Sequence, residues 1–180
     1  MHVNTLIVEV RNADLERVGQ ILPKDIKSLL LEDQFNNVGS WELAIASDHP
    51  LAPALREPGA GIIVSTGDGQ VLLSGPTIKP ESAVTVEDVK GTLTVSGLTD
   101  TVLLADRLAF PEPGNIDPET QSESHDVRIG PAETLMHEYV SANIGPNAPE
   151  GRRDPRLQMG VDGGRGPVVT KRARFPVLGD

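Results

Sequence analysis

Two short apolar runs joined by Gly67-Asp68-Gly69 predict a β-hairpin in the first half of the chain. The runs are residues 61–66 and 70–74, and the glycines between them tolerate the positive φ angles that tight hairpin turns require. Within both runs, apolar residues follow one another instead of alternating with polar ones. That pattern is typical of a sheet covered on both faces. We therefore expect other parts of the chain to pack on both sides of this hairpin.

The single tryptophan belongs to another predicted strand, residues 40–46. Trp41, Leu43 and Ile45 fall on one side of a period-two pattern, which is how a half-buried strand presents its core-facing side chains. We expect Trp41 to lie in the core. The residues expected to define the fold of this region are Trp41, Asp68, Gly69 and Gly75.

Strand-like segments account for most of the first hundred residues. Residues 3–10 and 17–22 predict a second hairpin, and residues 77–89 and 91–97 predict a further pair of strands. Residues 25–33 fit a helix or a strand equally well, and we favour a strand. The sequence thus predicts a mainly β fold, in the form of a barrel or a sandwich.

One α-helix is predicted, at residues 131–144. Pro131 suits the first helical position, Glu133 favours the positive end of the helix dipole, and Gly145-Pro146 ends the helix. Apolar side chains recur along it at helical spacing, at Ala132, Leu135, Met136, Tyr139, Val140 and Ile144. This stripe predicts a helix packed on the rest of the fold.

The remaining segments are predicted to be irregular. Residues 111–129 read as a polar loop, and residues 147–166 are rich in Gly, Pro, Arg and Asp. We expect a β domain over residues 1–145, which includes the helix. Residues 146–180 are expected to form an extended arm or linker, with the alternative that they lead into a further domain.

Charge is distributed unevenly along the chain. Residues 151–180 contain seven bases and three acids, whereas the first 150 residues contain 9 bases and 23 acids. An acidic body repels nucleic acid instead of collecting it, so we expect no specific nucleic-acid binding. Arg152, Arg153 and Arg156 are expected to form an assembly interface against an acidic neighbouring subunit.

Motifs for catalysis or cofactor binding are not found. The sequence contains no phosphate-binding Gly-Lys-Ser/Thr, no Gly-x-Ser-x-Gly and no cysteine. His137 lies four residues after Glu133, but without a third ligand a surface pair is the better interpretation. We predict no catalytic residue, no cofactor and no metal site, and expect the protein not to be an enzyme. No apolar run approaches the length of a membrane span, so the chain is expected to be made in the cytoplasm of its host.

Short motifs spread over nearly all of the chain carry a family resemblance. They are Trp41-x-Leu43-x-Ile45, His49-Pro50, residues 58–64, Asp68-Gly69, Ser74-Gly75-Pro76, Gly97 with Asp100, Leu104-x-Asp106-Arg107-Leu108 with Pro111, residues 132–134, Tyr139-Val140 and Asn143-x-Gly145-Pro146. In order and spacing the chain resembles the N-terminal part of the tail-hub proteins, also called minor tail or tail-tip proteins, of long non-contractile-tailed phages of actinobacteria.

The resemblance implies a virion structural protein at the distal end of the phage tail. Its first domain would resemble the tail-tube β-barrel or sandwich, and copies would assemble as a ring, typically a homotrimer with pseudo-sixfold character, around the DNA channel. The implied partners are other copies of the chain, the distal tail protein, other tail-tip proteins and the tape-measure protein.

Two other functions stay open from the sequence. The chain is alternatively a receptor- or glycan-binding module of the tail tip, which an exposed aromatic patch around Trp41 would support. It is alternatively the non-catalytic part of a tail-associated cell-wall hydrolase. A pocket with converging carboxylates or histidines would favour an enzyme.

Overall fold

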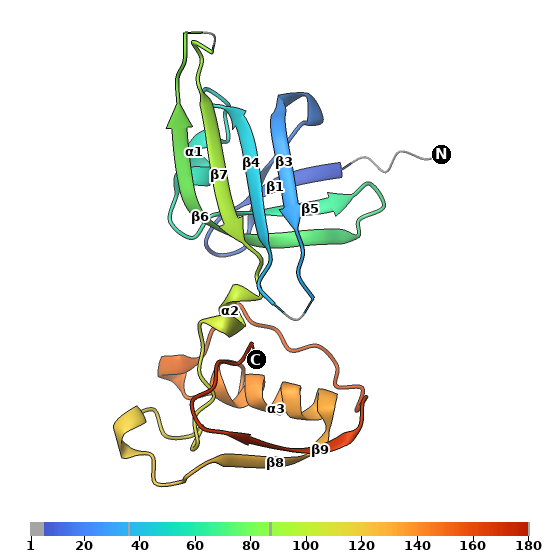
Figure 1. The fold of residues 1–180 in the computed structure, drawn as a ribbon, viewed down its shortest axis with the longest axis vertical. Coiled ribbons are helices and arrows are strands. Elements are labelled where there is room, and N and C mark those ends of the chain that lie inside the picture. The colour runs from blue at the N-terminus through green and yellow to red at the C-terminus, as the bar shows by residue number, and fades with distance from the viewer. Residues whose placement is uncertain (1–5, 36, 87, 180) are drawn as a thin grey trace. The chain divides into compact units, whose positions relative to one another are not determined.

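The computed structural model of the protein describes residues 6–35, 37–86 and 88–179. The chain forms two compact units, unit 1 up to residue 102 and unit 2 from residue 103 onward (Figure 1). The division between the units lies between Val102 and Leu103. The domain bounds expected from the sequence, residues 1–145 and 146–180, stay a prediction. The predicted strand start at residues 3–5 lies outside the described residues.

Unit 1 is a seven-stranded antiparallel sheet with the strand order β2-β1-β5-β6-β7-β4-β3. Its strands are β1 (Leu6–Arg11), β2 (Arg17–Ile21), β3 (Ile26–Glu32), β4 (Ser40–Ala46), β5 (Gly61–Thr66), β6 (Val71–Ala83) and β7 (Thr92–Leu98). The mainly β prediction is confirmed, and so is the preference for a strand at residues 25–33. The predicted hairpin around Gly67-Asp68-Gly69 is formed by β5 and β6.

The long strand β6 belongs to both halves of this sheet. Its first part pairs with β5 and its second part with β7, with a shift of register between Thr77 and Lys79. One hydrophobic cluster takes side chains from both halves, so the halves face each other as in a sandwich. The edge strands β2 and β3 do not pair, although only the 3-10 turn η1 (Pro23–Asp25) separates them along the chain.

The core of unit 1 follows the alternation of its strands. Buried and partly exposed residues alternate along all of β7, and Leu43, Ile45 and Ile62 are fully buried. The short helix α1 (Ala52–Arg56) adds Ala52 and Leu55 to the same cluster. The expectation that the central hairpin is covered on both faces is confirmed for β5, where all residues but Ile63 are buried. It is wrong for the start of β6, where Leu73 is buried but Val71 and Leu72 are exposed.

Unit 2 combines one hairpin with one well-formed helix. Its elements are η2 (Pro118–Thr120), β8 (Asp126–Pro131), α3 (Ala132–Asn143), η3 (Glu150–Arg152) and β9 (Val168–Ala173), while the short helix α2 (Val102–Ala105) spans the division between the units. The predicted helix at residues 131–144 is confirmed as α3. None of the helices in the described part of the chain is long and apolar enough to cross a membrane.

Two segments predicted to be irregular contain strands. The end of the predicted polar loop forms β8, and the predicted arm contributes β9, which pairs with β8 from Val168 to Ala173. In an extended arm the backbone N–H and C=O groups would bond to water. Here the N–H and C=O groups of β8 and β9 bond to each other instead, because each strand supplies the hydrogen-bond partners that the other lacks. Backbone bonds from Ala132 N to Pro167 O (3.1 Å) and from Glu133 N to Arg165 O (3.1 Å) then tie the chain before β9 to the start of α3.

Candidate functional site

A cavity of about 330 Å³ in unit 2 brings together four arginines, Arg107, Arg152, Arg153 and Arg156. Its apolar lining comes from Leu108, Phe110, Ile144 and Pro155. Three segments meet here: the chain that follows α2, the C-terminal end of α3, and η3 with the residues after it. We refer to this site below as the arginine cavity.

Asn143, at the end of α3, fixes the first of these segments. Its side chain is 1% exposed. Its Oδ1 accepts a hydrogen bond from Phe110 N (2.8 Å), and its Nδ2 donates to Tyr139 O (2.9 Å). The Phe110 backbone is therefore attached to the helix through a buried amide, which holds the Phe110 ring at the cavity wall.

Asp154 fixes the segment that follows η3. Its backbone N donates to Ile144 O (2.8 Å), and its buried carboxylate accepts from Arg156 Nε (2.9 Å) and Arg156 Nη2 (2.7 Å). The hydrogen bond from Arg156 is the main reason why the pKa of the Asp154 carboxyl is lowered from its usual value. The charge of Arg156 is thus balanced within the unit.

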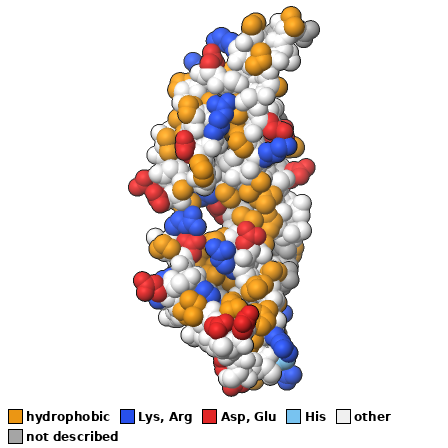
Figure 2. Space-filling view, turned by 90° about the vertical axis from the view of Figure 1, so that its left-hand side faces the viewer, with side chains coloured by type: hydrophobic (Ala, Val, Ile, Leu, Met, Phe, Trp, Pro, Cys, Tyr) orange, Lys and Arg blue, Asp and Glu red, His pale blue; other side chains and the backbone are white. Residues whose placement is uncertain are grey.

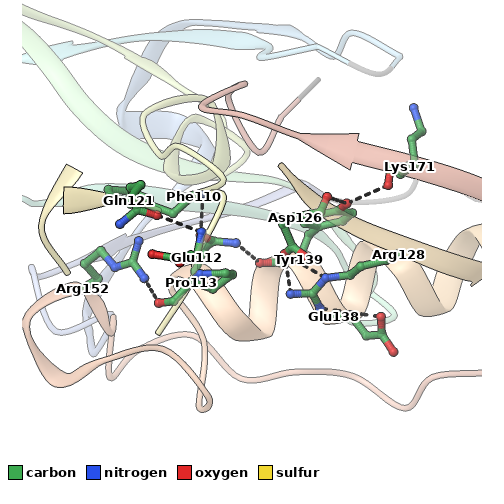
Figure 3. Close-up of polar contacts among 11 residues, drawn as sticks. Phe110, Glu112, Pro113, Gln121, Asp126, Arg128, Glu138, Tyr139, Arg152 and Lys171 are labelled. Atoms are coloured by element: carbon green, nitrogen blue, oxygen red, sulfur yellow. Dashed lines mark hydrogen bonds and ion pairs between the residues drawn. The ribbon is translucent and has the colours of Figure 1, made fainter. Parts of the chain in front are cut away.

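Arg152 lies over an aromatic ring. Its guanidinium carbon lies 3.9 Å from the centroid of the Phe110 ring, and its Nη2 donates to the Pro113 carbonyl oxygen (Figure 3). Its Nε and Nη1 are buried and have no acceptor among the described residues. Burial lowers the pKa of Arg152, because enclosure disfavours a charge that has no counterion.

The carbonyl that Arg152 contacts belongs to an ordered loop. Gln121 Oε1 accepts from Glu112 N (2.8 Å), next to Pro113 (Figure 3). The Glu112 carboxylate in turn accepts from Ser122 N (3.1 Å), and its hydrogen bonds to Ser122 lower its pKa. These contacts position the acceptor for Arg152 without adding a carboxylate to the cavity.

Arg107 and Arg153 complete the positive lining. Arg153 Nη2 donates to Ala148 O (3.0 Å), and Arg107 Nη1 lies 3.4 Å from Asp106 O. Within the described ranges no carboxylate lies at ion-pair distance from these two guanidiniums or from that of Arg152. The hydrogen-bond acceptors described for these three guanidiniums are therefore neutral carbonyls, although the charge of Arg107 also contributes to lowering the pKa of Asp154.

A second polar cluster in unit 2 is fully engaged. Arg128 lies 4.7 Å from the centroid of the Tyr139 ring and pairs with Asp126 (2.6 Å) (Figure 3). The Tyr139 hydroxyl lies 2.9 Å from the Asp126 carbonyl oxygen and 3.2 Å from that of Lys171, and burial raises its pKa. These contacts join β8 and β9 to α3, which is a structural role.

One comparison with known proteins identifies the chain's family. A family model described as siphovirus ReqiPepy6 Gp37-like protein matches residues 7–180, nearly the whole chain. The chain belongs to this family. This membership supports a phage structural protein, and the resemblance to siphovirus tail proteins is confirmed at the level of a siphovirus family. No curated protein gives a significant match.

The predicted assembly residues of the Gp37-like protein, Arg152, Arg153 and Arg156, all line the arginine cavity. Arg107 was not among them, because more than forty residues separate it from Arg152 and no spacing in the sequence links the two. Backbone bonds from Leu178 N to Arg107 O (2.8 Å) and from Ala109 N to Pro176 O (2.9 Å) hold its segment in place.

The predicted fold-defining residues lie in unit 1. Trp41 is 2% exposed and its Nε1 donates to Leu98 O (3.1 Å). Asp68 accepts from the Thr66 hydroxyl in the β5–β6 turn, and Gly69 has a φ of +88° there. A side chain at Gly75 would overlap the Leu98 carbonyl.

The possible metal pair at Glu133 and His137 is not assembled as a site. The Glu133 carboxylate accepts from Arg165 Nε (2.9 Å), Arg165 Nη2 (2.6 Å) and Arg165 N (2.8 Å). These bonds lower the pKa of Glu133 to about 2. The described residues contain no group of three or more potential metal ligands.

Proposed function

We propose that this Gp37-like protein is a tail-hub component at the distal tip of a siphovirus tail, where copies assemble as a ring, a homotrimer, around the DNA channel. Membership of a siphovirus protein family supports a place in the virion. The position at the tail tip rests on the motifs from Trp41 to Pro146 that resemble tail-hub proteins. Neighbours in that position are the distal tail protein, other tail-tip proteins and the tape-measure protein.

The open edges of the unit 1 sheet are the observation on which assembly mainly rests. Strands β2 and β3 each pair on one side, so each presents unpaired N–H and C=O groups on the other. Both edges also expose large apolar side chains, among them Val18 and Leu30, the latter with 56% of its surface exposed. A ring of subunits covers such edges, because the edge of one copy is paired or shielded by the next.

The tip of the β6–β7 hairpin offers a second apolar surface. Val84, Val86 and Val89 are exposed there, where β6 and β7 extend past the rest of unit 1 (Figure 1). Figure 2 shows hydrophobic side chains at this end of unit 1, at the top of the view. Exposed apolar groups on a projecting hairpin favour contact with another protein of the tail tip.

The net charge of −10 fits a channel through which DNA slides. Carboxylates repel phosphates, so a lumen lined by acidic residues does not retain the genome. A lumen lined mainly by Lys and Arg would contradict this part of the proposal.

We propose a role without catalysis. The arginine cavity contains one carboxylate, that of Asp154, which is bound by Arg156, and no histidine. A second cavity, of about 340 Å³ in unit 1, has Glu42 as its one acidic lining residue. Neither arrangement supplies a pair of groups for acid–base chemistry. The receptor- or glycan-binding alternative loses its main support, because Trp41 is buried.

Immunogold electron microscopy on the phage that encodes the chain tests the proposed position. An antibody raised against the chain is expected to place gold at the tail tip alone. Labelling along the tail tube, or on the head, would assign the protein to another part of the virion. Particles without label, together with free protein in the lysate, would remove the structural role altogether.

A further inference from the structure

We propose that the arginine cavity of unit 2 binds a carboxylate group, and that an acidic side chain of a neighbouring protein chain supplies it. The claim that a neighbouring chain supplies the carboxylate rests on the proposed function, because a neighbour exists only in an assembly. The claim that the cavity binds a carboxylate is independent of the proposed function, and can be tested on the isolated protein.

The first argument is the balance of charge inside the cavity. Arg107, Arg152 and Arg153 line one cavity of about 330 Å³, and their described acceptors are backbone carbonyls. Arg107 and Arg153 are exposed to solvent and Arg152 is partly buried. Like charges that line one cavity repel one another, and an anion between them removes this cost. Arg156 is not part of this set, because the bidentate contact with Asp154 already balances its charge.

The second argument is that Arg152 is arranged before any ligand binds. Its guanidinium is held between the Phe110 ring and the Pro113 carbonyl, and the Phe110 ring itself packs edge-on against Phe175 with centroids 5.3 Å apart. Nη2 already donates to Pro113 O, and the protein encloses Nε and Nη1, so Arg152 attracts a carboxylate in the cavity through its charge. No counterion for that charge lies at ion-pair distance among the described residues.

The third argument concerns the class of anion. The rest of the lining is apolar, with Leu108, Ile144 and Pro155 beside the guanidiniums. A glutamate or aspartate side chain presents methylene groups to such a lining together with its charge. A nucleic-acid backbone is a poorer ligand, because the chain as a whole has a net charge of −10 and repels a polyanion.

Isothermal titration calorimetry with the isolated 180-residue protein tests the proposal. The probes are the blocked peptide acetyl-Glu-Glu-Glu-amide, its uncharged counterpart acetyl-Gln-Gln-Gln-amide, citrate, and an oligothymidylate. We expect the glutamate peptide to bind and the glutamine peptide not to bind. The double variant Arg107→Gln/Arg153→Gln is expected to weaken peptide binding about tenfold or more, since two of the three positive groups without a described ion-pair partner are removed.

Arg172→Gln is the matched control. Arg172 is an exposed residue of β9 outside the cavity, so this variant makes the same chemical change without altering the lining. It is expected to bind the peptide as the unmodified protein does. Arg152 itself is left intact, because its stacking on Phe110 contributes to folding. Unfolding curves of both variants check that the fold is retained.

Equal binding of the glutamate and glutamine peptides, or equal loss in the double variant and in Arg172→Gln, would overturn the proposal. Tight binding of oligothymidylate that depends on Arg107 and Arg153 would instead assign a phosphate site. Citrate bound more tightly than the peptide would keep the carboxylate chemistry but make a free acid its source. Gold labelling away from the tail tip, with peptide binding intact, would contradict the proposed function and leave the carboxylate site standing.

Discussion

Replacing Gly75, within strand β6, with alanine is expected to destabilise unit 1 more than the same replacement at any other glycine of the unit. Asp100 N donates to Ser74 O (2.9 Å), so the chain that leaves β7 crosses directly over β6 at this point. A β-carbon at Gly75 would overlap the Leu98 carbonyl oxygen and lie 3.0 Å from Thr99 Cα. All of these neighbours are backbone atoms, which cannot move aside as a flexible side chain would.

The magnitude follows from what must be displaced. Overpacking in a close-packed region costs roughly 1–3 kcal/mol by itself. Moving the crossing segment also strains the bonds from Asp100 N to Ser74 O and from Thr99 N to Gly39 O (3.0 Å), each of which contributes about 1 kcal/mol. We therefore expect Gly75→Ala to lower the free energy of unfolding of unit 1 by about 3–5 kcal/mol.

Trp41 provides the assay, because it is the single tryptophan and lies buried in unit 1. Its fluorescence during urea denaturation reports the unfolding of unit 1 separately from unit 2, which contains the single tyrosine, Tyr139. Gly69→Ala is the control: Gly69 has a φ of +88° but open space around it, so we expect a cost of about 1 kcal/mol. A cost for Gly75→Ala no larger than that for Gly69→Ala would refute the argument from backbone overlap.

Three further predictions concern side chains. The pKa of Glu133 is about 2 in the folded protein against an ordinary value of 4.5, so its contribution to stability is complete above pH 4.5 and is lost as the pH falls toward 2. In the variant Arg165→Ala, an NMR titration is expected to find the pKa of Glu133 close to 4.5 again. Asn143→Ala leaves Phe110 N without its buried acceptor and is expected to cost about 1–3 kcal/mol in the urea unfolding of unit 2 followed by far-UV circular dichroism. Leu43→Ala removes a fully buried side chain and should cost about 2–5 kcal/mol by Trp41 fluorescence, whereas Val86→Ala, at a residue 99% exposed, should change stability by less than about 0.5 kcal/mol.

The β-strands of unit 1 could be predicted because their signal is local. Period-two alternation around Trp41 and the glycine turn at Gly67-Asp68-Gly69 act over a few residues, and so does the helical stripe of α3. The structure confirms β4, β5 and α3 within one or two residues of the expected bounds. It differs for β6, which runs unbroken from Val71 to Ala83 and joins the strand expected at residues 70–74 to the first part of the one expected at 77–89. The exposure of the start of β6 could not be predicted, because consecutive apolar residues do not show which of them faces the core.

The pairing of β8 with β9 could not be predicted from the sequence, for a different reason. The two strands are separated by α3 and by a segment rich in Gly, Pro and Arg, and neither shows an alternating pattern strong enough to indicate a partner. The arginine cavity is similar: Arg152, Arg153 and Arg156 were visible as a cluster, but Arg107 joins them only through the folding of the chain around α3. Contacts between distant residues depend on the tertiary structure, which local patterns do not encode.

Arg152 and the edges of the unit 1 sheet leave polar groups without partners, and we take these two places as the argument for assembly; Arg11 Nε, Ser47 Oγ and Thr77 Oγ1 of unit 1 are also buried without a partner among the described residues. In unit 2, Glu133 is bound by Arg165, and Asp154 is bound by Arg156. In contrast to these two ion pairs, Arg152 has two buried nitrogens without an acceptor among the described residues. The unit 1 sheet likewise has two edge strands that pair on one side only. Folded proteins pair nearly all of their buried polar groups, so such exceptions indicate surfaces completed by another chain. The sheet edges require backbone or apolar cover and the arginine cavity requires an anion, so ring assembly and carboxylate binding are separable by mutation.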